Sequence, residues 1–248
     1  MVLTSTVRKI IRFAVMHCPG AGIFLFAFLM ATASTAPALA SPAYGTRLPA
    51  AHQVFWGVQH YYIAGSSLDN NLGVLSSQQS YLAMSYGLTK WLALDLKWNL
   101  YGTFRHKNSS GAETVYKDSV WGGGYGFRLR LYESNPIRVI AGFQHFSIHP
   151  AALDFDGVKQ HGILEDWQGS LLVSRHFSLL SPYLGIRYNL TDYIRYTDDE
   201  RKMYKADGGR RVGLVCGVDV PLTEKTWVNL EADWQDGLSL AAALHWHF

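Results

Sequence analysis

The sequence predicts an all-β fold, a closed antiparallel transmembrane β-barrel of about ten strands that follows a cleaved signal peptide. Three observations predict it. Apolar and polar residues alternate in segment after segment, short turns alternate with longer polar loops, and the chain begins with the three parts of a secretory signal. The composition agrees, because a 14% aromatic content accompanies a near-neutral mean hydropathy, which is too polar for a bundle of membrane helices.

Residues 1–40 form the expected signal peptide. Arg8, Lys9 and Arg12 supply the positive start, an apolar core runs from Ile23 to Met30, and the small-residue cleavage site is Ala38-Leu39-Ala40. The apolar run is much shorter than the roughly 20 residues that a membrane-spanning helix needs. We therefore expect cleavage after Ala40 and one barrel domain over residues 41–248.

Charge and cysteine usage exclude several classes of protein. Without the three cations of the leader, the chain carries 19 Lys and Arg against 19 Asp and Glu, so it lacks the basic excess of a nucleic-acid-binding domain. Cys216 is then the single remaining cysteine, which rules out an internal disulfide framework. We expect no cofactor and no nucleic-acid partner.

Period-two alternation is clearest from Trp91 to Arg105. There Leu92, Leu94 and Leu96 share an apolar face with three later residues, and Asp95, Lys97, Asn99, Tyr101, Thr103 and Arg105 share the polar face. Such alternation predicts a strand with one apolar and one polar side. The ten expected strands are 54–63, 79–88, 91–105, 118–131, 137–148, 163–177, 183–195, 211–220, 227–234 and 238–248.

The links between these strands are of two kinds, which take turns along the chain. Tight turns are expected at 88–90, 133–136, 178–182 and 221–226, and polar loops at 64–77, 106–117, 149–162 and 196–210, with 235–237 as a short exception. Short turns at one end and longer loops at the other are typical of a transmembrane barrel. A closed sheet is also what lipid demands, because an unpaired peptide group in hydrocarbon costs several kcal/mol. The alternative is a periplasmic β-domain, whose strands also alternate.

The final strand carries an apolar residue at every second position from Leu238 to the terminal Phe248. This pattern resembles the C-terminal signal of bacterial outer-membrane β-barrel proteins. The resemblance implies location in the cell outer membrane of a Gram-negative bacterium, and a partner in the barrel-assembly machinery that reads Phe248. Outer-membrane lipid and lipopolysaccharide are the other expected partners.

Ten strands enclose a space only slightly wider than one that side chains can fill, whereas open aqueous channels begin at about sixteen strands. The expected inward-facing charges are nearly balanced in sign: Lys97, Arg105, Arg128, Arg130, Arg138, Arg187 and Arg211 against Asp95, Asp118, Asp166, Asp219, Glu231 and Asp233. Such balance favours internal ion pairs over a selective pore. The sequence therefore predicts a structural or surface-binding barrel with a largely plugged polar interior. A narrow channel for small solutes is an alternative.

One constellation suggests chemistry. His145 and Ser147 share strand parity with the apolar face of 137–148, and Glu165 shares parity with the apolar face of the next strand. A base, a hydroxyl and a carboxylate in proximity are what nucleophilic ester cleavage needs. The spacing is similar to that of the lipid A 3-O-deacylase family, and the resemblance implies that His145 is the base, Ser147 the nucleophile and Glu165 the orienting carboxylate of an esterase acting on outer-leaflet lipid. The alternative is that these residues are amphipathic positions at the membrane interface.

A metal site has little support from the sequence. The polar residues near the loop that follows 137–148 lack the tight spacing of zinc ligands, and loop polarity explains them: His145, His149, Asp154, Asp156 and His161. We therefore expect no bound metal.

Overall fold

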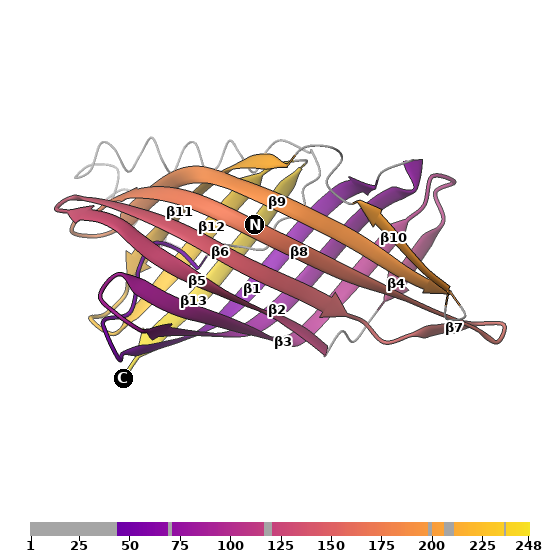
Figure 1. Ribbon diagram of the computed structural model, residues 1–248, viewed down its shortest axis with the longest axis horizontal. Helices are drawn as coiled ribbons and strands as arrows, with labels where there is room; N and C mark the ends of the chain where they lie inside the picture. The colour runs from indigo at the N-terminus through magenta and orange to yellow at the C-terminus, as the bar shows by residue number, and fades with distance from the viewer. Residues whose placement is uncertain (1–43, 69–70, 117–120, 198–199, 206–210, 236) are drawn as a thin grey trace, which may run out of the picture.

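A computed structural model describes residues 44–68, 71–116, 121–197, 200–205, 211–235 and 237–248 (Figure 1). The expected signal peptide, residues 1–40, lies outside the described residues. The described chain forms one antiparallel sheet whose strands are long and tilted. It contains no helix that is long and apolar enough to cross a membrane.

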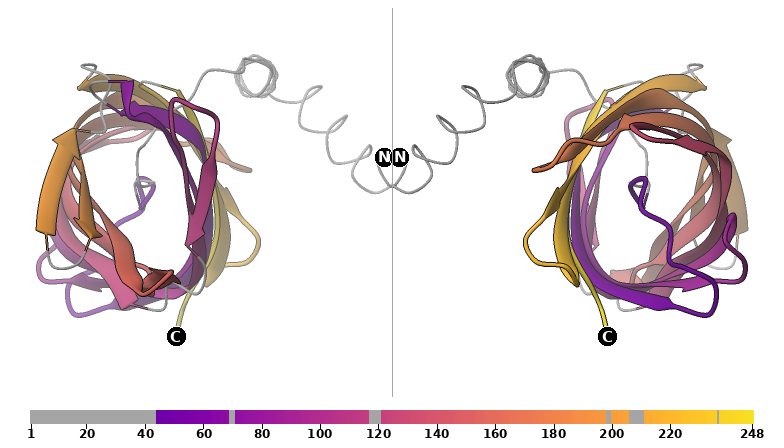
Figure 2. Two further views of the ribbon diagram at one scale, coloured as in Figure 1. Left: turned by 90° about the vertical axis from the view of Figure 1, so that its right-hand side faces the viewer. Right: turned by 90° about the vertical axis from the view of Figure 1, so that its left-hand side faces the viewer.

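Ten strands form a closed barrel, as the alternation predicts. Around the ring they are β1 (Val54–Leu68), β2 (Gly73–Gly87), β3 (Leu92–Lys107), β5 (Trp121–Ser134), β6 (Ile137–His149), β8 (Val158–Arg175), β9 (Ser181–Thr197), β11 (Val212–Pro221), β12 (Thr226–Trp234) and β13 (Leu238–His247). The ring closes because β13 pairs with β1, with Gln59 opposite Ala243. The end-on views show the closed ring (Figure 2).

Three short strands extend hairpins beyond the barrel. They are β4 (Glu113–Tyr116), β7 (Leu153–Phe155) and β10 (Glu200–Lys205), which pair with β3, β8 and β9 respectively. All three lie at the end where the longer loops connect the strands, and the short turns and the C-terminus lie at the opposite end (Figure 1). By the usual asymmetry of such barrels, the turn end is periplasmic and the loop end faces the cell exterior.

The first hairpin differs from the prediction. The sequence predicts a loop over 64–77, but β1 continues to Leu68 and β2 begins at Gly73. The Ser-rich and Gly-rich segment hides the alternation, and the register shifts between Ile63 and Ser66. Leu68 and Leu75 nevertheless point inward and are buried, so apolar packing extends the strands.

Along most strands the polar face points into the lumen and the apolar face points out. In β13, Leu240, Ala242 and Leu244 lie outside while Ser239 and Ala243 are buried inside. The outward surface carries aromatic side chains near both ends, such as Trp91 at the turn end and Trp121 at the loop end. A closed sheet with an apolar exterior flanked by aromatic residues is the arrangement that a membrane barrel needs. The protein is an integral barrel of the bacterial outer membrane.

β3 contains a bulge that corrects the predicted inward set. Leu100 and Tyr101 are consecutive yet both exposed, at 48% and 55%, because the register with β2 shifts at this point. An extra residue in one strand reverses the facing of every residue after it. Phe104 therefore points into the lumen and Arg105 points out, the reverse of the prediction.

Candidate functional site

The three residues of the predicted esterase site lie on the outer wall, meaning the membrane-facing surface of the barrel. In β6 the side chains of Gln144, Phe146 and Ile148 are buried in the lumen, so His145 and Ser147 point outward. Glu165 likewise lies on the outward parity of β8. The predicted common face is therefore present in the structure.

The register of β6 and β8 decides which of these residues meet. Ser147 lies directly opposite Glu165, whereas His145 lies opposite Trp167. The imidazole of His145 packs on the indole of Trp167, with 4.0 Å between the ring centroids. The Nδ1 atom of His145 is buried and has no hydrogen-bond partner among the described residues.

The hydroxyl of Ser147 pairs with a different histidine from the predicted one. Its Oγ lies 2.8 Å from Nε2 of His149, the last residue of β6. Residues two apart on a strand point to the same side, which places both side chains on the outer wall. The structure therefore brings Ser147 and His149 into contact at the loop end, and Glu165 lies opposite Ser147 on the neighbouring strand. Strand parity places Ser147 and His149 on one face, and the conformation of the two side chains then makes the contact.

A groove runs beside these residues along the outer wall. It encloses about 600 Å³ over β3, β5 and β6, and its lining includes Trp98, Trp121, Gly123, Tyr125, Ser147 and His149. Trp98 and Trp121 are 63% and 78% exposed, so these rings stand out from the wall. We call this feature the outer groove.

The lumen holds a second, larger set of chemically active side chains. Three cations and five carboxylates point inward and are buried: Lys97, Arg128 and Arg187 with Asp95, Asp166, Asp219, Glu231 and Asp233. We call this set and its hydrogen-bond partners the lumen network. The predicted charge network is present, although acids outnumber bases among these eight residues. Of the other predicted members, Arg105 and Arg211 are exposed, Arg130 and Arg138 are half-buried, and Asp118 lies outside the described residues.

Arg187 is the centre of one half of the lumen network. Its guanidinium donates to Glu231 at 2.7 Å and also to Asp233, and all three side chains are almost fully buried. The second oxygen of Glu231 accepts a hydrogen bond from the hydroxyl of Tyr183 at 2.7 Å. Paired buried charges of this kind are held in one geometry by their hydrogen bonds.

Arg128 is the centre of the other half. Its Nε donates to Asp95 at 2.8 Å. Its Nη1 donates to three backbone carbonyls, those of Tyr44, Gly45 and Arg47, at 2.9–3.2 Å. These carbonyls belong to the chain that precedes β1, so Arg128 joins the barrel wall to that segment.

The segment 44–53, which we call the N-terminal segment, enters the lumen at the turn end: residues 44–49 are largely buried inside the barrel, and residues 50–52 are exposed at its rim (Figure 2). Three of its side chains contact inward-facing side chains of the barrel wall. Thr46 bonds Asp219, the ring of Tyr44 lies 4.1 Å from the ammonium of Lys97, and the guanidinium of Arg47 lies 4.4 Å from the ring of Trp227. The sequence predicts no strand and no contact for this segment, since the first expected strand begins at residue 54.

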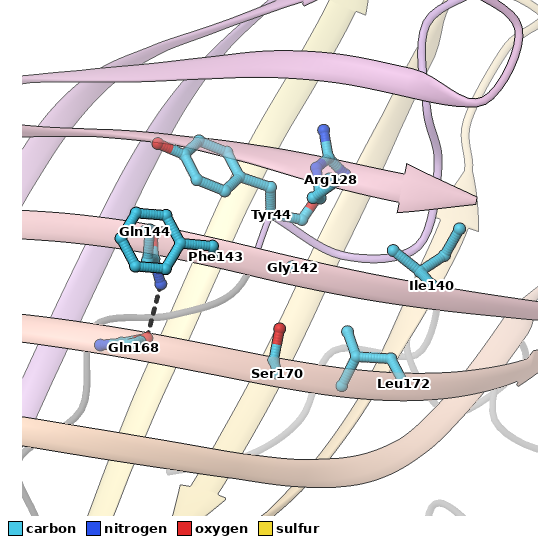
Figure 3. Close-up of a pocket in the computed structure, with 9 residues that line it drawn as sticks. All are labelled: Tyr44, Arg128, Ile140, Gly142, Phe143, Gln144, Gln168, Ser170 and Leu172. Atoms are coloured by element: carbon cyan, nitrogen blue, oxygen red, sulfur yellow. Dashed lines mark hydrogen bonds between the residues drawn. The ribbon is translucent and has the colours of Figure 1, made fainter. Parts of the chain in front are cut away.

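A small cavity lies beside the N-terminal segment. The cavity between Tyr44 and the inner wall of β6 and β8 measures about 10 Å³, which is room for about one water molecule. Figure 3 shows Tyr44 and Arg128 at this cavity, with Gln144 donating to Gln168 at 2.6 Å. The loop-end half of the lumen is filled by an apolar cluster that includes Tyr61, Tyr81, Phe104, Tyr116 and Phe146.

No group of three or more His, Cys, Asp or Glu side chains is placed to hold a metal ion within the described part of the chain. His149 instead shares a hydrogen bond with Ser147, and His161 stacks on Tyr196 with 4.4 Å between the ring centroids. Cys216, on the outward face of β11, has no disulfide partner.

No protein-family model and no curated protein matches the chain. Among solved structures, the transport unit of the autotransporter AIDA-I from Escherichia coli is 11% identical, with a TM-score of 0.49, and the match covers 92% of this chain and 97% of that one. The COG4313 outer membrane channel from Pseudomonas putida F1 is 12% identical, with a TM-score of 0.47 and coverage of 85% and 100%. The outer membrane protease OmpT from Escherichia coli is 10% identical, with a TM-score of 0.38 and coverage of 79% and 94%.

Proposed function

We propose that the protein is a barrel with a closed lumen that acts at its surface, as a structural or surface-binding component of the outer membrane. The observation that carries the proposal is the filling of the lumen. Arg128 and Asp219 hold the N-terminal segment across the turn end, and an apolar cluster fills the loop end. Ions need a continuous path of water or polar ligands, and this packing favours none.

Conductance in planar bilayers tests this proposal against the alternative of a narrow channel. The purified full-length protein should insert without producing steady single-channel steps. The protein used must show the heat-dependent gel mobility of a folded barrel. Reproducible steps of one size would then show that the lumen is a solute channel and is not closed.

A lipid esterase is the second candidate function, and the hydrogen bond between Ser147 and His149 favours it. In this mechanism the Ser147 hydroxyl attacks the carbonyl carbon of an acyl ester while its proton passes to Nε2 of His149. The protonated imidazole then gives that proton to the departing alcohol, and water releases the acyl group from the serine. Glu165, opposite Ser147, would orient the site. Geometry thus supports His149 as the base, whereas the resemblance to lipid A deacylases assigns that role to His145.

Mass spectrometry of lipid A tests the esterase. Cells that express the protein should lose an acyl chain from lipid A, and cells with Ser147→Ala should not. His149→Ala should act like Ser147→Ala, and His145→Ala should keep activity if His149 is the base. If the acyl pattern of lipid A is the same with and without the protein, the esterase is excluded and the surface-binding proposal is unaffected.

A further inference from the structure

The outer groove owes its shape to a missing side chain. Gly123 occupies an outward position on β5, opposite Trp98 on β3 and opposite Ser147 on β6. Along β5 the outward neighbours on either side are Trp121 and Tyr125. A single bare position is therefore surrounded by three aromatic rings and one hydroxyl, which produces a trough in the wall.

The floor of this trough is fixed by the close approach of the strands. A Cβ atom on Gly123 would lie 2.2 Å from the carbonyl oxygen of Lys97, and one on Gly122 would lie 2.4 Å from that of Ser147. Gly122 also has a φ of +140°, which disfavours other residues. Because no side chain fits on this floor, the outer groove is a built feature of the barrel.

The chemistry of the outer groove changes along its length. Toward the membrane centre it is lined by Leu96, Tyr125 and the ring of His145, which packs against Tyr125, and at the loop end it reaches the hydrogen-bonded pair Ser147 and His149. A second trough on the outer wall, over β8 and β9, is mainly aliphatic, as at Leu171 and Leu184, and its polar residues Ser174 and Arg175 lie at the turn end instead of the loop end. An apolar site with a few placed polar groups is the usual form of a specific ligand site.

We propose that the outer groove binds one acyl chain of lipid A, with the ester or hydroxyl oxygen of that chain at Ser147 and His149. The position of the outer groove in the membrane indicates which lipid binds there. Trp121 and His149 stand at the exterior ends of their strands, so the groove opens to the outer leaflet, which lipopolysaccharide forms in a Gram-negative outer membrane. The apolar end then receives the chain, and the polar end receives its oxygen atoms. The inference deepens the proposed surface-binding role and requires no catalysis.

Native mass spectrometry of the full-length barrel tests the inference. The protein would be extracted in a delipidating detergent, mixed with defined lipid A or with phosphatidylethanolamine, and examined for bound lipid. Two variants alter the groove: Ser147→Trp fills it, and Trp98→Ala removes one wall. Matched controls on other parts of the outer wall are Val173→Trp and Trp234→Ala, both at exposed positions. Each variant would first be checked for the heat-dependent gel shift.

We expect one lipid A per barrel in the wild type and in both controls, and about tenfold less in Ser147→Trp and Trp98→Ala. Equal binding in groove and control variants would overturn the inference, as would preferential retention of phosphatidylethanolamine. The mass of the bound lipid A separates this result from the esterase, since binding alone leaves all of its acyl chains in place. A conducting lumen would refute the closed lumen without affecting this result.

Discussion

Thr46 and Asp219 lie 173 residues apart in the chain and meet inside the barrel. The backbone N–H of Thr46 donates to the carboxylate of Asp219 at 3.1 Å, and the Thr46 hydroxyl donates to the same oxygen at 2.9 Å. The other oxygen of Asp219 accepts from Asn229 at 2.9 Å. A carboxylate with this many donors is strongly stabilised in its position. This contact ties the N-terminal segment to the wall formed by β11 and β12.

Deletion of residues 44–50 should open the turn end of the lumen. Those residues supply the carbonyls that Arg128 binds and the hydroxyl that Asp219 binds. The apolar cluster still fills the loop end, so we expect water to enter the turn end alone, seen as faster hydrogen exchange in β12 of the detergent-solubilised barrel. A deletion in the exposed loop 108–112 should leave this exchange unchanged. If the 44–50 deletion inserts normally and exchange in β12 is also unchanged, the segment does not close the turn end.

Arg187→Ala should strongly destabilise the barrel. The substitution leaves Glu231 and Asp233 buried beside each other without their cation, and the loss of one partner of a buried ion pair costs about 3–5 kcal/mol. Urea unfolding in micelles, followed by tryptophan fluorescence, measures the loss in free energy of unfolding. Arg105→Ala is the control, since its pair with Glu113 is exposed and such pairs contribute about 0–1 kcal/mol. Equal effects of the two substitutions would show that the lumen network does not stabilise the barrel.

Ile186→Lys tests the direction in which the outer wall faces. Ile186 is exposed on β9, between outward residues Leu171 and Leu214 of the neighbouring strands. A lysine on the lipid face costs about 2–4 kcal/mol near the bilayer midplane. We expect a loss of this size in unfolding from lipid vesicles, with little change for Ile186→Leu. A negligible loss for the lysine variant would place this face in water.

Deletion of Phe248 should impair assembly in cells more than folding in vitro. Its side chain is 88% exposed, so its removal should change the stability of the refolded barrel by less than about 0.5 kcal/mol. Recognition by the assembly machinery, as proposed from the C-terminal pattern, would nevertheless be lost. Comparison of outer-membrane abundance with refolding yield in detergent separates the two effects. Normal abundance without Phe248 would remove the proposed role of this residue.

The strand pattern was predictable because membrane and lumen impose opposite polarity on alternate residues. Leu94 and Asp95, for example, differ in polarity and face opposite sides. The bulge at Tyr101 was not predictable, since an extra residue in a strand leaves no mark in an aromatic-rich sequence. Beyond the bulge, Phe104 and Arg105 were therefore assigned to the wrong faces.

In the candidate site, too, strand parity predicts which side each residue faces, but it does not predict the contacts between side chains. Parity placed His145, Ser147 and Glu165 on one wall, which the structure confirms. The serine contact with His149 depends on side-chain conformation, and the outer groove depends on the pairing of Gly123 with two other strands. The role of Tyr44 and Thr46 depends on partners more than 80 residues away. Such contacts follow from three-dimensional packing alone.

Closure of the sheet by the first and last strands is tested most directly by a cysteine pair. Gln59 and Ala243 are direct partners on β1 and β13, and antiparallel partners have Cα atoms about 4.5–5.5 Å apart, within reach of a disulfide. In a Cys216→Ala background, Gln59→Cys with Ala243→Cys should form an intramolecular disulfide in outer-membrane fractions, seen as altered mobility of the boiled, non-reduced chain. Free thiols at both positions in correctly localised protein would show that the barrel is not closed at this seam.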